Sequence, residues 1–223
     1  MIKLFIFDLD GVLASTSEEH FTAWKEVIKD NFNIIVEDYV EEFTKGVSRM
    51  DSLNKILDTY NIKVSNSKKV ELAYIKNEKY KDLISKFNET NLFSGVKELF
   101  QFLKSKKILI ALGSASKNGP ALIKSLGIDG YFDYLVDPGP LNSKPHPDIF
   151  NSAMNHFSLK PNECIGMEDA ISGVKAIKSA HMIAIGIGKK DVLTEADYVY
   201  DSIKSVEFGF LETLIKDKYG KAD

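Results

Sequence analysis

Two aspartates near the start of the chain, Asp8 and Asp10, have the residue type and spacing that could hold a metal or move protons. They follow an apolar run at residues 4–7, which predicts a strand buried on both faces, as in a parallel sheet. Side chains two residues apart project to the same side of an extended chain, so both carboxylates should meet at the carboxyl edge of that sheet, where open α/β folds bind ligands. The alternative is that a polar turn simply ends the strand here, but such a turn accounts well for one aspartate and poorly for two.

Three further apolar runs also end in polar residues, and each predicts a strand. The run at 108–112 leads to Ser114, the run at 134–136 to Lys144, and the run at 163–167 to Glu168 and Asp169. Parallel strands share one carboxyl edge, and four carboxylates gathered there would repel one another unless a dication were bound. Oxygen ligands without histidine or cysteine favour Mg²⁺. We therefore predict a magnesium site formed by Asp8, Asp10, Glu168 and Asp169.

A cleft of this composition suits phosphoryl transfer. A carboxylate beside Mg²⁺ and a lysine can attack phosphorus and form an aspartyl-phosphate, and Asp8 suits that role because it ends the buried strand. Asp10 could then act as general acid and base. Lys144 and Mg²⁺ would neutralise charge on the phosphoryl group, and the Ser114 hydroxyl would bind its oxygens.

The elements that must position these residues follow an α/β pattern. Strands alternate with helices from residue 91 onward, which predicts a Rossmann-like parallel sheet covered on both sides. Further strands are predicted at 182–187 and 198–200, and helices after Gly95, between Pro120 and Gly127, and over 148–157, 170–179 and 206–219, with the charged tail 216–223 fraying.

The segment from residue 18 to about 88 has a different pattern. Apolar residues recur there at three- and four-residue spacing, which predicts helices, and only 33–36 is ambiguous with a strand. We interpret this block as an α-helical cap domain inserted after the first strand. The expected division is a core at 1–14, a helical cap domain at 15–90 and the rest of the α/β core at 91–223.

Composition excludes several classes of protein. The 223 residues are 44% hydrophobic and 27% charged, an ordinary globular mixture that excludes a disordered chain. A net charge of −3 gives no electrostatic case for nucleic acid or membrane. No apolar run approaches the roughly 18–20 residues that span a bilayer and no secretory signal is visible, so we expect a cytoplasmic protein. Cys164 is the single cysteine, and we interpret it as a buried structural thiol.

The polar motifs also carry a resemblance to a known family. Segments 8–12 and 144–145, together with Ser114 and the pair Glu168 and Asp169, resemble in order and spacing the four motifs of the haloacid dehalogenase-like phosphotransferases. The resemblance implies a magnesium-dependent enzyme and identifies the helical block as the family's cap. Within the family the chain is similar to the mutases that interconvert β-D-glucose 1-phosphate and β-D-glucose 6-phosphate through β-glucose 1,6-bisphosphate.

That resemblance implies roles for residues of the cap. A bisphosphate would place one phosphate at Asp8 and the other against the cap, where an arginine could fork onto it. Thr16 and His20, four residues apart on one helix face, are implied to lie at the hinge near Asp10 and to link cap closure to its protonation. The implied substrate-binding residues are Lys45, Gly46, Arg49, Ser52, Lys76, Ser114, Ala115, Ser116 and Asn118.

Departures from the pattern of those mutases, which include a rearranged and shorter loop at 138–140, and three alternatives remain open. Ser15 stands where those mutases usually have aspartate, and Ala170 where a small hydroxyl residue is common. The chief alternative is a phosphatase of the same family acting on a small phosphate ester, although Arg49 and Lys76 argue for a second phosphate. A receiver-type signalling module would be shorter and lack the helical insert, and a non-catalytic binding protein would not need the intact acidic set. We expect a monomer that binds a sugar phosphate and neither nucleic acid nor membrane.

Overall fold

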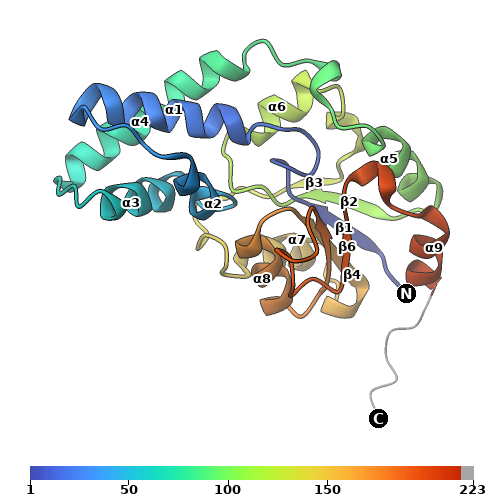
Figure 1. The fold of residues 1–223 in the computed structure, drawn as a ribbon. Coiled ribbons are helices and arrows are strands. Elements are labelled where there is room, and N and C mark those ends of the chain that lie inside the picture. Colours follow the sequence, from blue (N-terminus) through green and yellow to red (C-terminus); the bar gives the residue numbers. More distant parts are fainter. Residues whose placement is uncertain (217–223) are drawn as a thin grey trace.

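The computed structural model describes residues 1–216, which contain a six-stranded parallel sheet with the strand order β3-β2-β1-β4-β5-β6 (Figure 1). Every neighbouring pair of strands in that order is parallel, and the first strand of the sequence lies in the middle of the sheet. The α/β fold predicted from the sequence is therefore confirmed. The strands are β1 (Leu4–Phe7), β2 (Leu109–Leu112), β3 (Tyr134–Leu135), β4 (Cys164–Glu168), β5 (Ile183–Ile187) and β6 (Tyr198–Tyr200).

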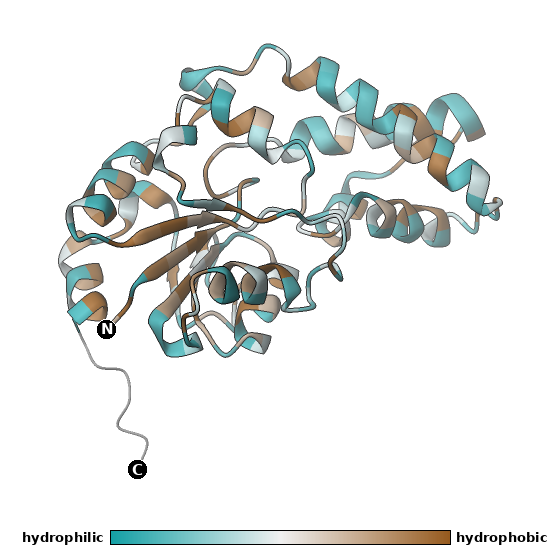
Figure 2. Cartoon of the chain, turned by 180° about the vertical axis from the view of Figure 1, so that it is seen from behind, coloured by the Kyte–Doolittle hydropathy of each residue, from teal (hydrophilic) through white to brown (hydrophobic). Residues whose placement is uncertain are grey.

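Helices cover both faces of the sheet, as Figure 2 shows by the apolar strands lying between them. Successive residues of β1 enter different apolar clusters because side chains alternate along a strand. Phe5 and Phe7 belong to the cluster shared with α5 (Val96–Ser105), α6 (Gly119–Ser125) and α9 (Phe208–Lys216). Leu4 and Ile6 belong to the cluster shared with α7 (Asp148–His156) and α8 (Ile171–Ser179). All four residues are buried, which explains why β1 is apolar throughout rather than alternating.

The block between β1 and α5 is helical and has an apolar cluster of its own. It contains α1 (Ser17–Phe32), α2 (Glu41–Thr44), α3 (Arg49–Thr59) and α4 (Asn66–Ile84). Trp24, Leu53 and Leu72 bring three of these helices together in that cluster. Figure 1 shows these helices grouped beside the sheet. The ambiguous segment 33–36 is not a strand: it is irregular, and Val36 is buried in the helical cluster. The domain boundaries at 14/15 and 90/91 stay a prediction.

Two predicted strands begin one residue too early, for the same physical reason. The amide of Ile108 bonds to the carbonyl of Leu103, and the amide of Met182 bonds to that of Ile177, so each residue closes the turn of the preceding helix. Lys107 and His181, with φ of 59° and 58°, are the left-handed residues that make those turns. The strands therefore start at Leu109 and Ile183.

The remaining differences are small. The strand predicted at 163–167 is displaced by one residue and includes Glu168, the strand at 134–136 spans two residues, and the last helix begins at Phe208. The predicted fraying beyond Lys216 falls outside the described residues. Short 3₁₀ turns at Asp38–Val40, Glu89–Asn91, Asp129–Tyr131, Pro161–Glu163 and Ile203–Ser205 join the elements. Cys164 is buried at the start of β4, as predicted. Within residues 1–216 no helix is long and apolar enough to cross a membrane.

Candidate active site

The carboxyl end of β1 brings a nucleophile candidate beside a buried lysine. Phe7 is in register with Leu112 and Met167, so Asp8 lies level with the ends of β2 and β4. Lys144, in the segment after β3, is only 3% exposed. Its Nζ donates to Asp8 Oδ1 at 2.7 Å and to Glu168 Oε1 at 2.6 Å. One lysine therefore holds two buried carboxylates apart and orients both.

Asp8, Glu168 and Asp169 form a cluster that fits a hard metal ion. Each offers one carboxylate oxygen, and these oxygens all lie within 4.8 Å of one another. The chain turns sharply to allow this approach: Gly11 has a φ of +80°, and a Cβ on it would lie 2.0 Å from Asp169 Oδ2. Asp10 was also predicted as a ligand, but among the described residues its carboxylate does not belong to this cluster. The three oxygens suit an octahedral cation such as Mg²⁺.

The electrostatics of this cluster show an excess of negative charge. Burial raises the pKa of Glu168 to about 7, and burial together with the charge of Asp8 raises the pKa of Asp10 to about 8. Burial and the charge of Glu168 raise the pKa of Asp169 well above its usual value. Burial opposes the charge of Lys144, but the two carboxylates that it contacts outweigh burial and raise its pKa. One lysine does not balance these acids, so a further cation would be bound favourably.

A cavity of about 360 Å³ opens above these groups and is walled on the other side by the helical block. Most of the predicted site residues line it, from both parts of the chain. They are Asp8, Asp10, His20, Lys45, Gly46, Arg49, Ser52, Lys76, Ala115, Ser116, Lys144 and Asp169.

Four predicted site residues do not line the cavity. Glu168 is fully buried beneath Lys144. Ser114 is also buried, and its Oγ accepts from the amide of Ser116, which shapes the turn after β2. Thr16 is fully buried. Asn118 instead joins the two sides of the cleft through its amide.

On the cap wall a lysine is buried against aromatic rings instead of carboxylates. Lys76 is 1% exposed, and its Nζ lies 4.7 Å from the ring centroid of Tyr80 and 5.5 Å from that of Trp24. The same atom contacts Nδ1 of His20. Burial and the nearby charge of Arg49 lower the pKa of Lys76 to about 7. The aromatic rings partly stabilise the ammonium group of Lys76. A bound anion would stabilise its buried charge further.

His20 lies between this lysine and the acid pair of the core. Its Nε2 is 3.7 Å from Asp10 Oδ2, and its ring stacks on Tyr80 with centroids 3.8 Å apart. Burial and the charge of Lys76 lower the pKa of His20 well below its usual value. A neutral imidazole in this place can accept from Lys76 through Nδ1 and donate toward Asp10 through Nε2.

Hydrogen bonds cross the mouth of the cleft and involve three serines, Ser48, Ser143 and Ser172, that were not predicted as site residues. The amide of Ser48 donates to Ser143 Oγ at 2.7 Å, and Ser172 Oγ donates to the carbonyl of Lys45 at 3.3 Å. Ser48 also caps α3 by accepting from the amide of Asp51, which sets Arg49 as the first residue of that helix. The cap is therefore closed on the core.

A central acid at the end of a parallel strand, a lysine that reaches it, an acidic cluster and a helical lid define a class of phosphoryl-transfer proteins. The chain belongs to the haloacid dehalogenase-like hydrolase family, whose model matches residues 2–181. The family resemblance stated from the motifs is thereby confirmed.

Among its relatives, the chain is 41% identical over 201 residues to the β-phosphoglucomutase of Bacillus subtilis, covering 89% of this chain and 88% of that protein. It is 32% identical over 182 residues to the phosphorylated carbohydrates phosphatase of Thermotoga maritima, covering 80% and 82%. The crystal structure of β-phosphoglucomutase from Clostridium difficile superposes with a TM-score of 0.93 at 38% identity, covering 96% of this chain and 97% of that one.

Proposed function

We propose that this protein is a magnesium-dependent β-phosphoglucomutase that interconverts β-D-glucose 1-phosphate and β-D-glucose 6-phosphate. The observation that carries the proposal is the opposite charge of the two walls of one cavity: three clustered carboxylates on the core, and Arg49 and Lys76 on the cap. A monophosphate hydrolase needs one phosphate site, whereas a mutase that passes through a bisphosphate needs two. The likeness to the Bacillus subtilis and Clostridium difficile mutases supports the same conclusion.

Each half-reaction uses the same two aspartates. Asp8 attacks phosphorus and forms an aspartyl-phosphate, and the bond from phosphorus to the departing sugar oxygen breaks. Asp10, whose pKa is raised by burial and by the charge of Asp8, acts as the general acid and gives a proton to that oxygen. In the reverse direction Asp10 takes the proton of the sugar hydroxyl as that oxygen attacks the phosphorus on Asp8. Lys144 stays on Asp8 and offsets negative charge on the phosphoryl group.

Two such half-reactions complete the isomerisation. The phosphoenzyme first phosphorylates O6 of β-glucose 1-phosphate, which gives the 1,6-bisphosphate. The bisphosphate then presents its other phosphate to Asp8 and leaves as glucose 6-phosphate. Bound Mg²⁺ would be held by Asp8, Glu168 and Asp169, with Asp10 contributing its backbone, and would supply charge neutralisation at the phosphoryl group.

The remaining predicted residues have proposed positions in this scheme. Arg49 and Lys76 hold the phosphate that is not reacting, together with Ser116 and Asn118 on the core side. Lys45, Gly46, Ser52 and Ala115 contact the sugar, and Ser114 shapes the turn that holds the reacting phosphate. Thr16 and His20 place Asp10 when the cap closes.

Incubation with β-glucose 1-phosphate, Mg²⁺ and a trace of the bisphosphate, followed by phosphorus NMR, tests the proposal. We expect the glucose 1-phosphate signal to be replaced by that of glucose 6-phosphate. Release of inorganic phosphate alone would instead favour a sugar-phosphate phosphatase, the second candidate, which the likeness to the Thermotoga maritima enzyme supports.

We further propose that the enzyme acts in the cytoplasm. We also propose that it is a monomer, because residues of one chain form both walls of the cavity. Sedimentation at assay concentration should give the mass of a single chain, and a dimer mass would refute this.

A further inference from the structure

Asn77, on α4, lies between the two donors proposed to hold the distal phosphate. Its Oδ1 accepts from Arg49 Nη2 at 2.6 Å and from Asn118 Nδ2 at 2.9 Å. Its Nδ2 points the other way and donates to Glu78 Oε1 at 3.3 Å. The two donors on one atom set the orientation of the amide, since the opposite orientation would place N–H groups against N–H groups. One neutral oxygen thus ties a helix of the cap to a loop of the core.

The charge of Arg49 has no ion-pair partner within residues 1–216. Glu78 is the acid that acts on it at longer range, and that carboxylate is paired with Lys81 at 2.9 Å. Burial lowers the pKa of Arg49, although an arginine stays charged in proteins. A half-buried guanidinium whose close partner is a neutral amide retains most of its attraction for an anion.

We propose that Asn77 is a positioning residue for the distal phosphate: its amide oxygen holds Arg49 and Asn118 together from opposite sides of the cleft and leaves the charge of Arg49 to the ligand. The inference rests on the proposed function, because it assumes that a bisphosphate spans the cavity. Arginine carries five N–H donors and the asparagine amide two, so each keeps donors free after bonding Asn77. Fixing these side chains before the ligand arrives reduces the entropy lost on binding.

This role explains why residue 77 carries an amide rather than a carboxylate. An aspartate would accept the same two hydrogen bonds but would also neutralise Arg49 and repel the phosphate. The change is nearly isosteric, so it separates the effect of charge from the effect of shape. An alanine would release Arg49 without neutralising it, and a smaller loss of affinity should follow.

The test measures affinity for glucose 1,6-bisphosphate by calorimetry in the Asp8→Asn background with Mg²⁺, where turnover is prevented. We expect Asn77→Asp to raise Kd by about tenfold or more and Asn77→Ala by about threefold. The melting temperature of Asn77→Asp should be unchanged or higher, because a new ion pair to Arg49 would form. A merely structural role would instead lower both affinity and melting temperature.

Asn54 provides a matched control on the same pair of cap helices. Its Oδ1 accepts from Lys69 Nζ at 2.7 Å, and neither residue lines the cavity. Asn54→Asp should leave Kd within about twofold, since it changes charge equally but away from the ligand. This inference alone would be overturned if the bisphosphate bound tightly and Asn77→Asp did not weaken that binding. It would also be overturned if Asn54→Asp weakened binding as much as Asn77→Asp. Failure of the Asp8→Asn protein to bind the bisphosphate at all would overturn the proposed function as well.

Discussion

The two walls of the cleft each bury a lysine almost completely, and their surroundings have opposite effects on it. Lys144, on the core wall, touches two carboxylates, and its pKa is raised despite burial. Lys76, on the cap wall, touches two aromatic rings and a histidine, and burial lowers its pKa to about 7. The same residue type at the same burial is therefore stabilised as a cation on one wall and destabilised on the other.

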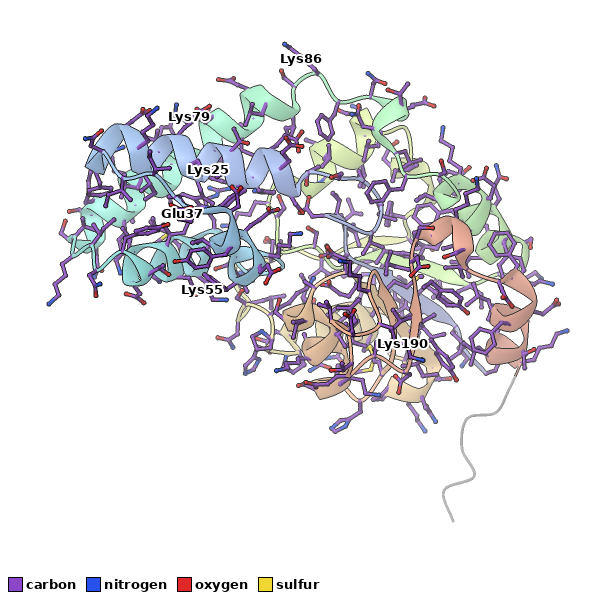
Figure 3. All side chains as sticks on the ribbon, in the orientation of Figure 1. Lys25, Glu37, Lys55, Lys79, Lys86 and Lys190 are labelled. Carbon is purple, nitrogen blue, oxygen red and sulfur yellow. The ribbon has the colours of Figure 1, made fainter. Side chains whose placement is uncertain are left out.

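This difference shows which ligand each wall lacks. The core wall has more acids than Lys144 can balance and would be stabilised by a cation. On the cap wall Glu41 pairs with Lys45, but Arg49 and Lys76 have no carboxylate within ion-pair distance among the described residues, so an anion would stabilise them. Lys79, labelled in Figure 3, shows the ordinary alternative one turn along the same helix. It is partly exposed and pairs with Glu26 at 2.8 Å and Asp30 at 3.3 Å. Lys79 thus pairs with two carboxylates of α1, whereas Lys76 has no carboxylate within ion-pair distance among the described residues.

Removal of the nucleophile should have the largest effect. Asp8→Asn keeps the shape of the side chain but cannot form the aspartyl-phosphate, so turnover should fall by about 10⁴-fold or more. Incubation with labelled bisphosphate should leave no acid-stable label on the protein. Full turnover in this variant would exclude a covalent mechanism in every form.

The two lysines can be compared directly by replacing each with methionine. Lys144→Met leaves two buried carboxylates without their cation and should lower the free energy of unfolding by about 3–5 kcal/mol at pH 7 without Mg²⁺. Lys76→Met removes a cation that lacks a carboxylate partner and should be neutral or stabilising. Urea denaturation measures both. Equal destabilisation by the two changes would contradict the contrast between the walls, and both variants should lose turnover.

The core wall could be predicted from the sequence, and most of the cap wall could not. Asp8, Lys144 and Asp169 follow parallel strands, and the geometry of a sheet brings such residues to one edge whatever the details of packing. The cap residues were assigned only through a resemblance, because spacing along a helix shows which face is polar but not what the face meets. Arg49 and Lys76 were found in that way.

Residues whose place at the site depends on contact between distant segments could not be predicted from the sequence. Tyr80 has helical spacing typical of a core residue, yet its ring packs against His20 and Lys76 at the cleft. Ser143 and Ser172 contact the cap across the mouth of the cleft, which requires knowing where the cap docks. The strand starts at Leu109 and Ile183 were missed because apolar patterning does not show that the preceding amide closes a helix.

Removal of the Arg49 charge from the cap wall should impair isomerisation of the sugar phosphate more than hydrolysis of a simple phosphate ester. Arg49→Ala should lower kcat/KM for isomerisation by about 10²-fold, which is a loss of about 2.7 kcal/mol of transition-state binding. Hydrolysis of para-nitrophenyl phosphate, which carries no second phosphate, should change by much less. Arg49→Lys should restore part of the isomerisation, because the charge remains but the fork of donors does not. Equal losses on both substrates would indicate that Arg49 serves the core wall.

The stability of the protein without ligands should pass through a minimum near pH 8. Asp10 and Glu168, with pKa values raised to about 8 and about 7, hold protons in the folded state that the unfolded chain releases above about pH 4, so their contribution to stability falls as pH rises to 8. Lys76, with a pKa of about 7, is neutral when folded and charged when unfolded, so stability rises with pH from 7 to about 10.

Ligands allow the two limbs of this profile to be assigned to the two walls. Mg²⁺ should raise the melting temperature most at and above pH 7, where the core acids would otherwise lose their protons, and should remove the acid limb. Lys76→Met should remove the alkaline limb and leave the acid limb unchanged. Differential scanning fluorimetry from pH 5 to pH 10, with and without Mg²⁺, measures both effects. A melting temperature that rises steadily from pH 5 to pH 8 without Mg²⁺ would show that the core acids are already balanced, and the contrast between the walls would then be lost.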